Sequence, residues 1–134
     1  MKKVFLGGTC SSKWRDAFIS TLKIDYYNPV VDDWTPSAQQ EEDRQKKLCQ
    51  YHLYVVTPNM EGIFSIAELI DDSNKIKNHT IICFLKEDVK DGVVTAWTPQ
   101  QERSIAAVVR MARYNGAICL PDLKKVTDWL NSVR

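Results

Sequence analysis

The sequence predicts a doubly wound α/β sandwich, in which one parallel sheet of five strands is covered by helices on both faces. Short apolar runs alternate about five times with segments of helical spacing. The stretches between these runs are long enough for helical crossovers between parallel strands. Residues 80–85 form an apolar run without alternation, as expected of a strand buried on both faces, and we place this strand at the centre of the sheet.

The first half of the chain contains three predicted strands and two predicted helices. Residues 4–6 form the first strand, and Gly7-Gly8 ends it. A helix follows from Trp14, with Ser11 or Ser12 placed to cap it. The remaining elements are a strand at 25–28, a surface loop at 30–38, a polar helix at 39–50 and a strand at 53–56. The charge order of the polar helix predicts a solvated face with Glu42–Lys46 and Asp43–Lys47 pairs.

The second half continues the same alternation. A helix from Ile63 ends near Ser73-Asn74 and leads to the strand at 80–85. Thr98 and Gln101 form a capping box for the next helix, which Asn115-Gly116 ends. A last strand at 117–120 and a helix that begins at Pro121-Asp122 complete the expected order.

Length and charge restrict the classes of function. The chain has 134 residues, which is the size of one domain. Its 18 basic and 17 acidic side chains give a net charge of +1, and this small charge disfavours a nucleic-acid polymer as partner. No apolar run approaches the roughly 20 residues of a membrane span, and we expect a cytoplasmic protein. The four cysteines are widely spaced, which predicts reduced thiols and no metal site.

Several α/β functions are excluded by their motifs. The chain has neither a G-x-G-x-x-G fingerprint nor a Walker phosphate loop, and no cofactor is expected. Thr57 stands where a receiver domain has an acid. Cys10 and Arg15 are too close together for a cysteine phosphatase loop, and we interpret Cys10 as a packing residue.

Ligands of this fold class bind at the carboxyl ends of the strands, near the point where strand order reverses. That rule directs attention to the loops at 7–13, 30–34 and 57–65. Glu68 follows the third loop in a mostly apolar helix, where an acid is conspicuous. It is either a solvated helix residue or a nucleophile or base that faces a ligand above the sheet.

The strings VFLGGT at 4–9, WR at 14–15, YNPVVDDW at 27–34, LYVVTPNM at 53–60 and SIAE at 65–68 resemble the nucleoside 2-deoxyribosyltransferase-like family. The resemblance covers residues 3–85. It implies a flavodoxin-like fold and cleavage or exchange of the N-glycosidic bond of a nucleoside or nucleoside monophosphate. It also implies that Glu68 is the nucleophile, which forms a glycosyl-enzyme in the manner of retaining glycosidases.

The resemblance further implies a set of site residues. Asp33 is expected to act with Glu68 and to hold the base or the sugar hydroxyls, and Trp34 either stacks on the base or packs at the root of its loop. Ser65 would bind a 5′ hydroxyl or phosphate, with Ser11, Ser12 and Arg15 assisting for a monophosphate, although Arg15 is equally compatible with a solvated helix position. The predicted substrate-binding residues are Gly7, Gly8, Thr9, Arg15, Asn28, Trp34, Met60, Gly62 and Ser65.

Departures from the family pattern leave other functions open. Gly62 stands where transferases have an acid, Phe64 where they have a glycine, and Cys49-Gln50 where they have a Ser-Asp pair. These differences are compatible with a different leaving group, with hydrolysis alone, or with a module that binds a nucleotide without turnover. NAD cleavage is a third possibility.

The remaining expectations concern charge, partners and other side chains. A neutral nucleoside or a monophosphate suits the small net charge better than a triphosphate, since Glu68 and Asp33 are both negative. The resemblance implies a homodimer or larger homo-oligomer. His52 and His79 are expected at the starts of strands, at the end of the sheet opposite the site. Trp97 and Trp129 are interpreted as core or dimer contacts.

Overall fold

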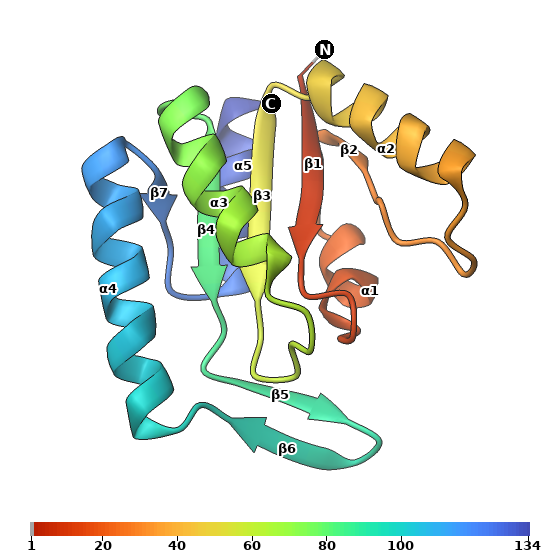
Figure 1. Ribbon diagram of the computed structural model, residues 1–134. Coiled ribbons are helices and arrows are strands. Elements are labelled where there is room, and N and C mark those ends of the chain that lie inside the picture. Colours follow the sequence, from red (N-terminus) through yellow and green to blue (C-terminus); the bar gives the residue numbers. More distant parts are fainter. Residues whose placement is uncertain (1) are drawn as a thin grey trace.

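A parallel sheet of five strands forms the centre of the molecule (Figure 1). The computed structural model describes residues 2–134. The strand order is β2-β1-β3-β4-β7, and every neighbouring pair is parallel. This order is that of flavodoxin-like folds, so the predicted fold class is confirmed. The strands are β1 (Lys3–Gly8), β2 (Asp25–Tyr27), β3 (Tyr51–Val56), β4 (Thr80–Phe84) and β7 (Ile118–Cys119).

Five helices cover the two faces of the sheet. Helices α1 (Trp14–Ile19) and α5 (Leu123–Val133) pack on one face. The other face carries α2 (Pro36–Leu48), α3 (Phe64–Lys75) and α4 (Pro99–Asn115), as Figure 1 shows. Alternate strand residues point to opposite faces, which divides the core into two apolar clusters. Within residues 2–134, no helix combines the length and the apolar character that crossing a membrane requires.

The central strand is β3 and not β4. All six residues of β3 are buried, and β3 pairs with β1 on one side and with β4 on the other. The sequence of β3 contains His52 and two tyrosines, so it looks less apolar than the run at 80–85. Burial of these polar groups depends on hydrogen bonds to neighbouring elements, which a local pattern does not reveal.

Most helix ends agree with the sequence, with two differences. The capping box of Thr98 and Gln101 is present, and Gly116 ends α4 in the left-handed conformation, so both predictions are confirmed. Helix α2 starts earlier than predicted, because Thr35 caps it and accepts a hydrogen bond from the Ala38 amide. Lys13 stands at the N-cap of the short α1, and Ser12 Oγ accepts from the Trp14 amide at 3.3 Å.

A β-hairpin between β4 and α4 was not predicted. Its strands are β5 (Glu87–Lys90) and β6 (Val93–Ala96), and they lie beyond the carboxyl ends of the central strands (Figure 1). The turn residues Asp91 and Gly92 both have positive φ, at 52° and 77°. Asp-Gly is a preferred pair for such a two-residue turn, so this dipeptide is the signal that identifies the hairpin.

Candidate functional site

A hollow of about 250 Å³ lies at the carboxyl ends of β1 and β3. These are the strands at which the chain order reverses, so the hollow occupies the position where α/β folds of this kind bind ligands. Two loops and the first turns of α3 form its wall. The lining residues are Gly8, Thr9, Cys10, Ser11, Met60, Glu61, Gly62, Phe64, Ser65 and Glu68.

Direct hydrogen bonds fasten the two loops of the hollow to each other. The Thr57 amide donates to Thr9 Oγ1 at 3.0 Å, and the Thr9 amide donates to the Val55 carbonyl at 2.9 Å. The Ser11 hydroxyl donates to the Asn59 carbonyl at 2.6 Å. Thr9 is 4% exposed, so its side chain mainly holds the two loops together and presents little surface to the hollow.

The glycine pair at the end of β1 has a packing role. A Cβ on Gly8 would stand 2.0 Å from the Val55 carbonyl oxygen, and Gly8 has a φ of +113°. A Cβ on Gly7 would meet the Tyr54 ring at 2.8 Å. Both glycines therefore permit a close approach of β1 to β3. Gly8 also lines the hollow, so the sequence interpretation, in which the glycines admit a ligand, stays a prediction beside this packing role.

Arg15 lies beneath the first loop and does not line the hollow. It is 3% exposed, donates from Nε to the Leu6 carbonyl at 3.1 Å and from Nη1 to the Thr9 carbonyl at 2.9 Å, and stacks on Trp14. Burial lowers the pKa of Arg15 to about 10, so the side chain remains a cation at neutral pH. The alternative of a solvated helix residue was wrong, and the structure places Arg15 as a clamp for the Thr9 backbone.

The predicted residues between β2 and α2 stand apart from the hollow. Asp33 is exposed, and Trp34 is 66% exposed, with its Nε1 donating to Gln39 Oε1 at 3.2 Å. Packing of Trp34 at the loop root was therefore wrong. Asn28 Oδ1 accepts from the Val30 amide at 3.1 Å. Figure 1 shows this loop extending to the side of the sheet, and none of these three residues lines the hollow.

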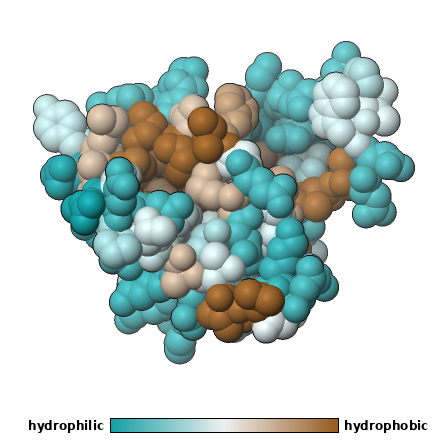
Figure 2. Space-filling view, turned by 60° about the horizontal axis from the view of Figure 1, so that its bottom comes forward, coloured by the Kyte–Doolittle hydropathy of each residue, from teal (hydrophilic) through white to brown (hydrophobic). Residues whose placement is uncertain are grey.

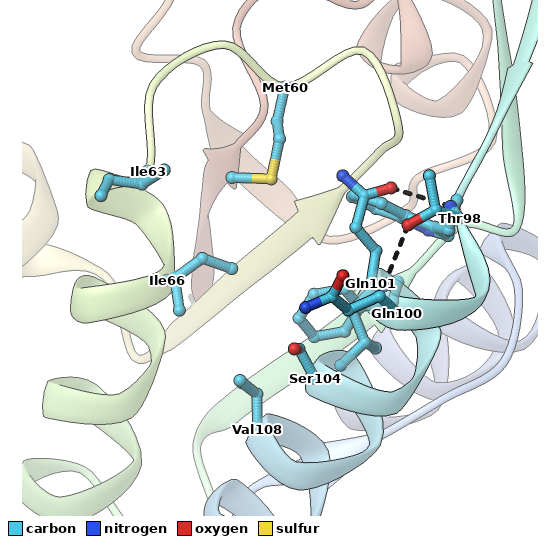
Figure 3. A pocket seen from close by; sticks show the side chains of 11 residues that line it. Met60, Ile63, Ile66, Thr98, Gln100, Gln101, Ser104 and Val108 are labelled. Atoms are coloured by element: carbon cyan, nitrogen blue, oxygen red, sulfur yellow. Dashed lines mark hydrogen bonds between the residues drawn. The ribbon is translucent and has the colours of Figure 1, made fainter.

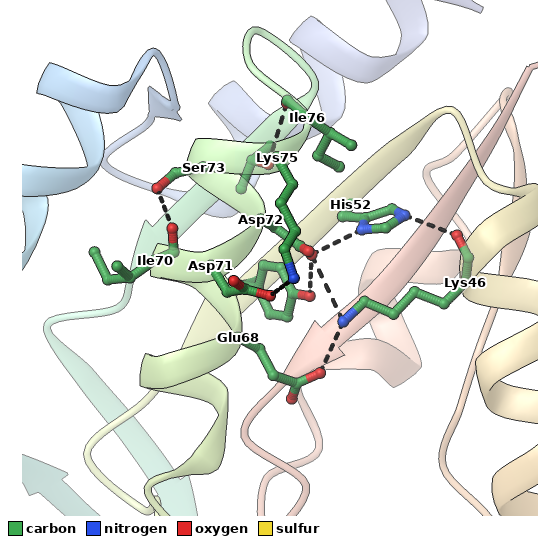
Figure 4. Close-up of polar contacts among 11 residues, drawn as sticks. Lys46, His52, Glu68, Ile70, Asp71, Asp72, Ser73, Lys75 and Ile76 are labelled. Atoms are coloured by element: carbon green, nitrogen blue, oxygen red, sulfur yellow. Dashed lines mark hydrogen bonds and ion pairs between the residues drawn. The ribbon is translucent and has the colours of Figure 1, made fainter.

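Glu68 forms an ion pair across the gap between α3 and α2. Lys46 Nζ donates to Glu68 Oε2 at 2.9 Å, and the two side chains are 22% and 21% exposed (Figure 4). The expected Glu42–Lys46 and Asp43–Lys47 pairs are replaced by this contact and by an Arg44–Glu41 pair. Glu68 lines the hollow on one side and a cleft between α2 and α3 on the other.

Asp72 extends the network one helical turn beyond Glu68. Its Oδ2 lies 3.6 Å from Lys46 Nζ, accepts from the Tyr54 hydroxyl and lies 2.8 Å from His52 Nδ1 (Figure 4). Burial by itself raises the pKa of Asp72, but the hydrogen bonds from His52 and Tyr54 and the charge of Lys46 together hold that pKa below its ordinary value. Asp72 is thus an ionised carboxylate at neutral pH.

His52 connects this network to α2. Its Nε2 lies 2.8 Å from the Lys46 carbonyl oxygen, while its Nδ1 faces Asp72. Through these two contacts the ring joins the Asp72 carboxylate of α3 to the backbone of α2. His52 lies near the start of β3, as predicted, and His79 directly precedes β4 with its ring beside Tyr51. Neither histidine lines the hollow.

The acidic groups around Glu68 affect one another. Burial raises the pKa of Glu42, and the charges of Glu68 and Asp43 add to that effect. Burial and the hydrogen bond to Asp72 raise the pKa of Tyr54, so its hydroxyl keeps its proton. Within residues 2–134, Lys46 is the only cation with a nitrogen within 4.0 Å of the Glu68 carboxylate.

The family model described as nucleoside 2-deoxyribosyltransferase-like matches residues 1–86 of the chain. The chain belongs to this family. No curated protein and no solved structure matches it in the other two comparisons. The matched residues extend from the first strand through β4, so they include the hollow, Glu68 and the whole network of Lys46, His52 and Asp72.

The hairpin, α4, β7 and α5 lie outside the residues that match the nucleoside 2-deoxyribosyltransferase-like model. Of these elements, α4 and the two residues before it contribute to a second hollow of about 440 Å³ between α3 and α4 (Figure 3). Its lining is mainly apolar, with Met60, Ile63 and Ile66 facing Val108, and it contains only neutral polar groups such as Ser104. Figure 2 shows a broad apolar patch near this part of the surface.

The sequence missed Lys46, Asp72, Tyr54 and His52 as members of the site. Lys46 was interpreted as part of a solvated charge run, and only its contact with Glu68 across two helices reveals another role. Asp72 follows Glu68 by four residues, the spacing that places two side chains on one helix face. That spacing was the available signal for a second carboxylate beside the first.

Proposed function

We propose that the protein cleaves or exchanges the N-glycosidic bond of a nucleoside or nucleoside monophosphate, with Glu68 as the nucleophile. The observation that carries this proposal is the position of the Glu68 carboxylate, which lines the hollow at the reversal point of the sheet. Membership of the nucleoside 2-deoxyribosyltransferase-like family supports it, because the matched residues include Glu68.

The proposed reaction has two steps. In the first, a Glu68 oxygen forms a bond to C1′ of the sugar while the C1′–N bond breaks, and its electron pair leaves with the base, which takes up a proton. In the second, water or another base attacks C1′, and the Glu68 carboxylate is restored. A sugar attacked twice from opposite faces retains its configuration.

The size and charge of the hollow favour a small and uncharged sugar. A volume of about 250 Å³ lies below the roughly 300–1,000 Å³ of sites for drug-sized ligands, so the hollow suits the sugar while the base extends outward. The lining contains two acids, Glu61 and Glu68, and no lysine or arginine. This charge favours a neutral nucleoside over a monophosphate, and disfavours a triphosphate.

The test is release of free base from a panel of nucleosides, monophosphates and NAD, followed by chromatography. We expect release by the unmodified protein and loss of release in Glu68→Gln. Glu61→Gln is the matched control, since Glu61 lines the same hollow and its carboxylate lies 3.6 Å from Lys90 Nζ. Mass spectrometry after rapid quenching should find one sugar on the peptide that contains Glu68. Equal release by Glu68→Gln would falsify the assignment.

A second candidate is a module that binds a nucleoside without turnover. Two observations favour it: Glu68 is already paired with Lys46, and the large Phe64 side chain lies where transferases have a glycine. The same panel separates the candidates. A ligand that binds and is recovered intact, with no base released, supports the binding module and rejects the enzyme.

A further inference from the structure

Lys46 is placed to act on Glu68 and on Asp72 in turn. Its Nζ lies 2.9 Å from Glu68 Oε2 and 3.6 Å from Asp72 Oδ2. The ammonium group also lies over the rings of Phe5 and Tyr54, 5.5 and 5.6 Å from their centroids. It is therefore held between two carboxylates and two aromatic faces, all of which stabilise a positive charge.

We propose that Lys46 is a positioning residue for the Glu68 carboxylate, and that Asp72 is the partner that takes its ammonium group when the charge of Glu68 is consumed. This inference rests on the proposed function. Before reaction, Lys46 fixes one carboxylate oxygen, Oε2, and leaves the other free to attack C1′. When the glycosyl ester forms, Glu68 becomes neutral and its attraction for Lys46 weakens. The ammonium group then moves toward Asp72.

Asp72 is suited to this role because its own position is fixed. It is 7% exposed and held by the Tyr54 hydroxyl and by His52 Nδ1 at 2.8 Å. His52 is anchored in turn by the Lys46 backbone carbonyl, at 2.8 Å from Nε2. The receiving carboxylate and the backbone that carries the ammonium group are therefore linked through one imidazole ring.

A pH profile is one readout, so the other titratable groups near Glu68 matter. The Cys10 thiol lines the same hollow. The acidic groups that surround Glu68 come from α2, β3, the β3–α3 loop and α3 itself, and they are Glu42, Asp43, Tyr54, Glu61, Asp71 and Asp72. Most of them are carboxylates, so removal of Lys46 leaves Glu68 in a negative environment that disfavours its ionised form.

The first experiment replaces Lys46 and measures base release against pH. We expect Lys46→Met to lower kcat by about 10- to 100-fold with little change in KM, and to shift the acid limb of the kcat profile to higher pH. Lys46→Arg keeps the charge and should restore kcat to within about tenfold of the unmodified protein, with the acid limb in place. Lys47→Met is the matched control on the exposed face of α2 and should change neither.

The second experiment tests Asp72 through the burst of base release in a single turnover. We expect Asp72→Asn to slow the burst, since the ammonium group loses its second partner, while breakdown of the glycosyl-enzyme is not slowed. Asp71→Asn is the control, because Asp71 is exposed and pairs with Lys75 at 2.8 Å. Circular dichroism checks each fold, and Lys46→Gln replaces Lys46→Met if the latter does not fold.

The outcomes separate this inference from the proposed function. If Glu68→Gln releases base normally, the function itself is rejected. If Glu68→Gln is inactive but Lys46→Met retains the kcat and the acid limb of the unmodified protein, only the role of Lys46 is rejected. An unchanged burst rate in Asp72→Asn overturns the transfer of the ammonium group to Asp72.

Discussion

Three glycines allow the steric and the conformational costs of adding a methyl group to be measured separately. Gly8 has a φ of +113° and a Cβ there would stand 2.0 Å from Val55 O and 2.6 Å from Val55 N. Gly92 has a φ of +77° with no atom within 4 Å of its Cβ position, and Gly62 has neither constraint. Replacing Gly8 by alanine therefore adds both costs, replacing Gly92 adds only the conformational cost, and replacing Gly62 adds neither.

The magnitudes follow from this geometry. A positive φ costs alanine about 1–2 kcal/mol, which is the full expectation for Gly92→Ala. Gly8→Ala adds a clash with the backbone of β3, which cannot withdraw because it is paired on both sides. Overpacking of this kind costs about 1–3 kcal/mol, so the two costs together come to about 2–5 kcal/mol. Gly62→Ala should be neutral or stabilise by up to about 1 kcal/mol, through the unfolded chain.

Urea unfolding followed by circular dichroism measures the three variants against the unmodified protein. We expect the unfolding free energy to be highest for Gly62→Ala, lower for Gly92→Ala and lowest for Gly8→Ala. The m values of Gly62→Ala and Gly92→Ala should be unchanged. A Gly8→Ala protein that does not fold without urea also agrees with the prediction, because about 2–5 kcal/mol is a large part of a typical domain's stability. Equal stability of Gly8→Ala and Gly92→Ala would refute the close approach of β1 to β3.

Three further predictions concern a thiol, a carboxylate and a guanidinium. Cys10 is the exposed cysteine, and burial raises the pKa of Cys49 to about 11 and of Cys83 to about 12. A thiol reagent should therefore modify Cys10 first, and a nucleoside bound in the hollow should slow that reaction. Rapid labelling of all four cysteines, or labelling of Cys10 at the same rate with and without the nucleoside, would contradict this prediction. The pKa of Asp72 is lower in the folded state than in the unfolded chain, so its stabilisation is present above about pH 4 and is lost as the pH falls through the folded value. Asp72→Asn should accordingly flatten the acid side of a plot of unfolding free energy against pH, and an unchanged acid slope contradicts this. Arg15→Lys cannot keep both contacts with the Leu6 and Thr9 carbonyls, and should cost about 1.5–3 kcal/mol in urea unfolding, whereas a neutral result would reject the clamp.

The sequence predicted the fold because its strongest signals are local. Periodicity located the strands of the parallel sheet, and Thr98 with Gln101 and Gly116 marked the ends of α4. The centre of the sheet could not be located in the same way. The polar atoms of β3 are satisfied by partners on α3 and α2, and a local pattern does not contain those partners.

The candidate site was predicted in part for the same reason. The loops after β1 and β3 meet because parallel strands place their carboxyl ends at one edge, so Gly8, Thr9 and Glu68 line one hollow. The loop that carries Asp33 and Trp34 was expected there too. That loop follows the edge strand β2, and its exposed side chains extend beside the sheet.

The position of Glu68 depends on a helix that is fastened to the sheet mainly by polar contacts. Helix α2 has no buried residue, so burial of apolar side chains contributes little to its docking. Its polar contacts are the Lys46 carbonyl with His52 at 2.8 Å, Gln45 Oε1 with Lys3 Nζ at 2.9 Å, and the Lys46 ammonium group with Glu68 at 2.9 Å and Asp72 at 3.6 Å. All of these contacts except that of Gln45 with Lys3 belong to the network around Glu68. The contacts that orient the carboxylate thus also hold α2 against the sheet, and a change that releases Lys46 from α3 weakens both together.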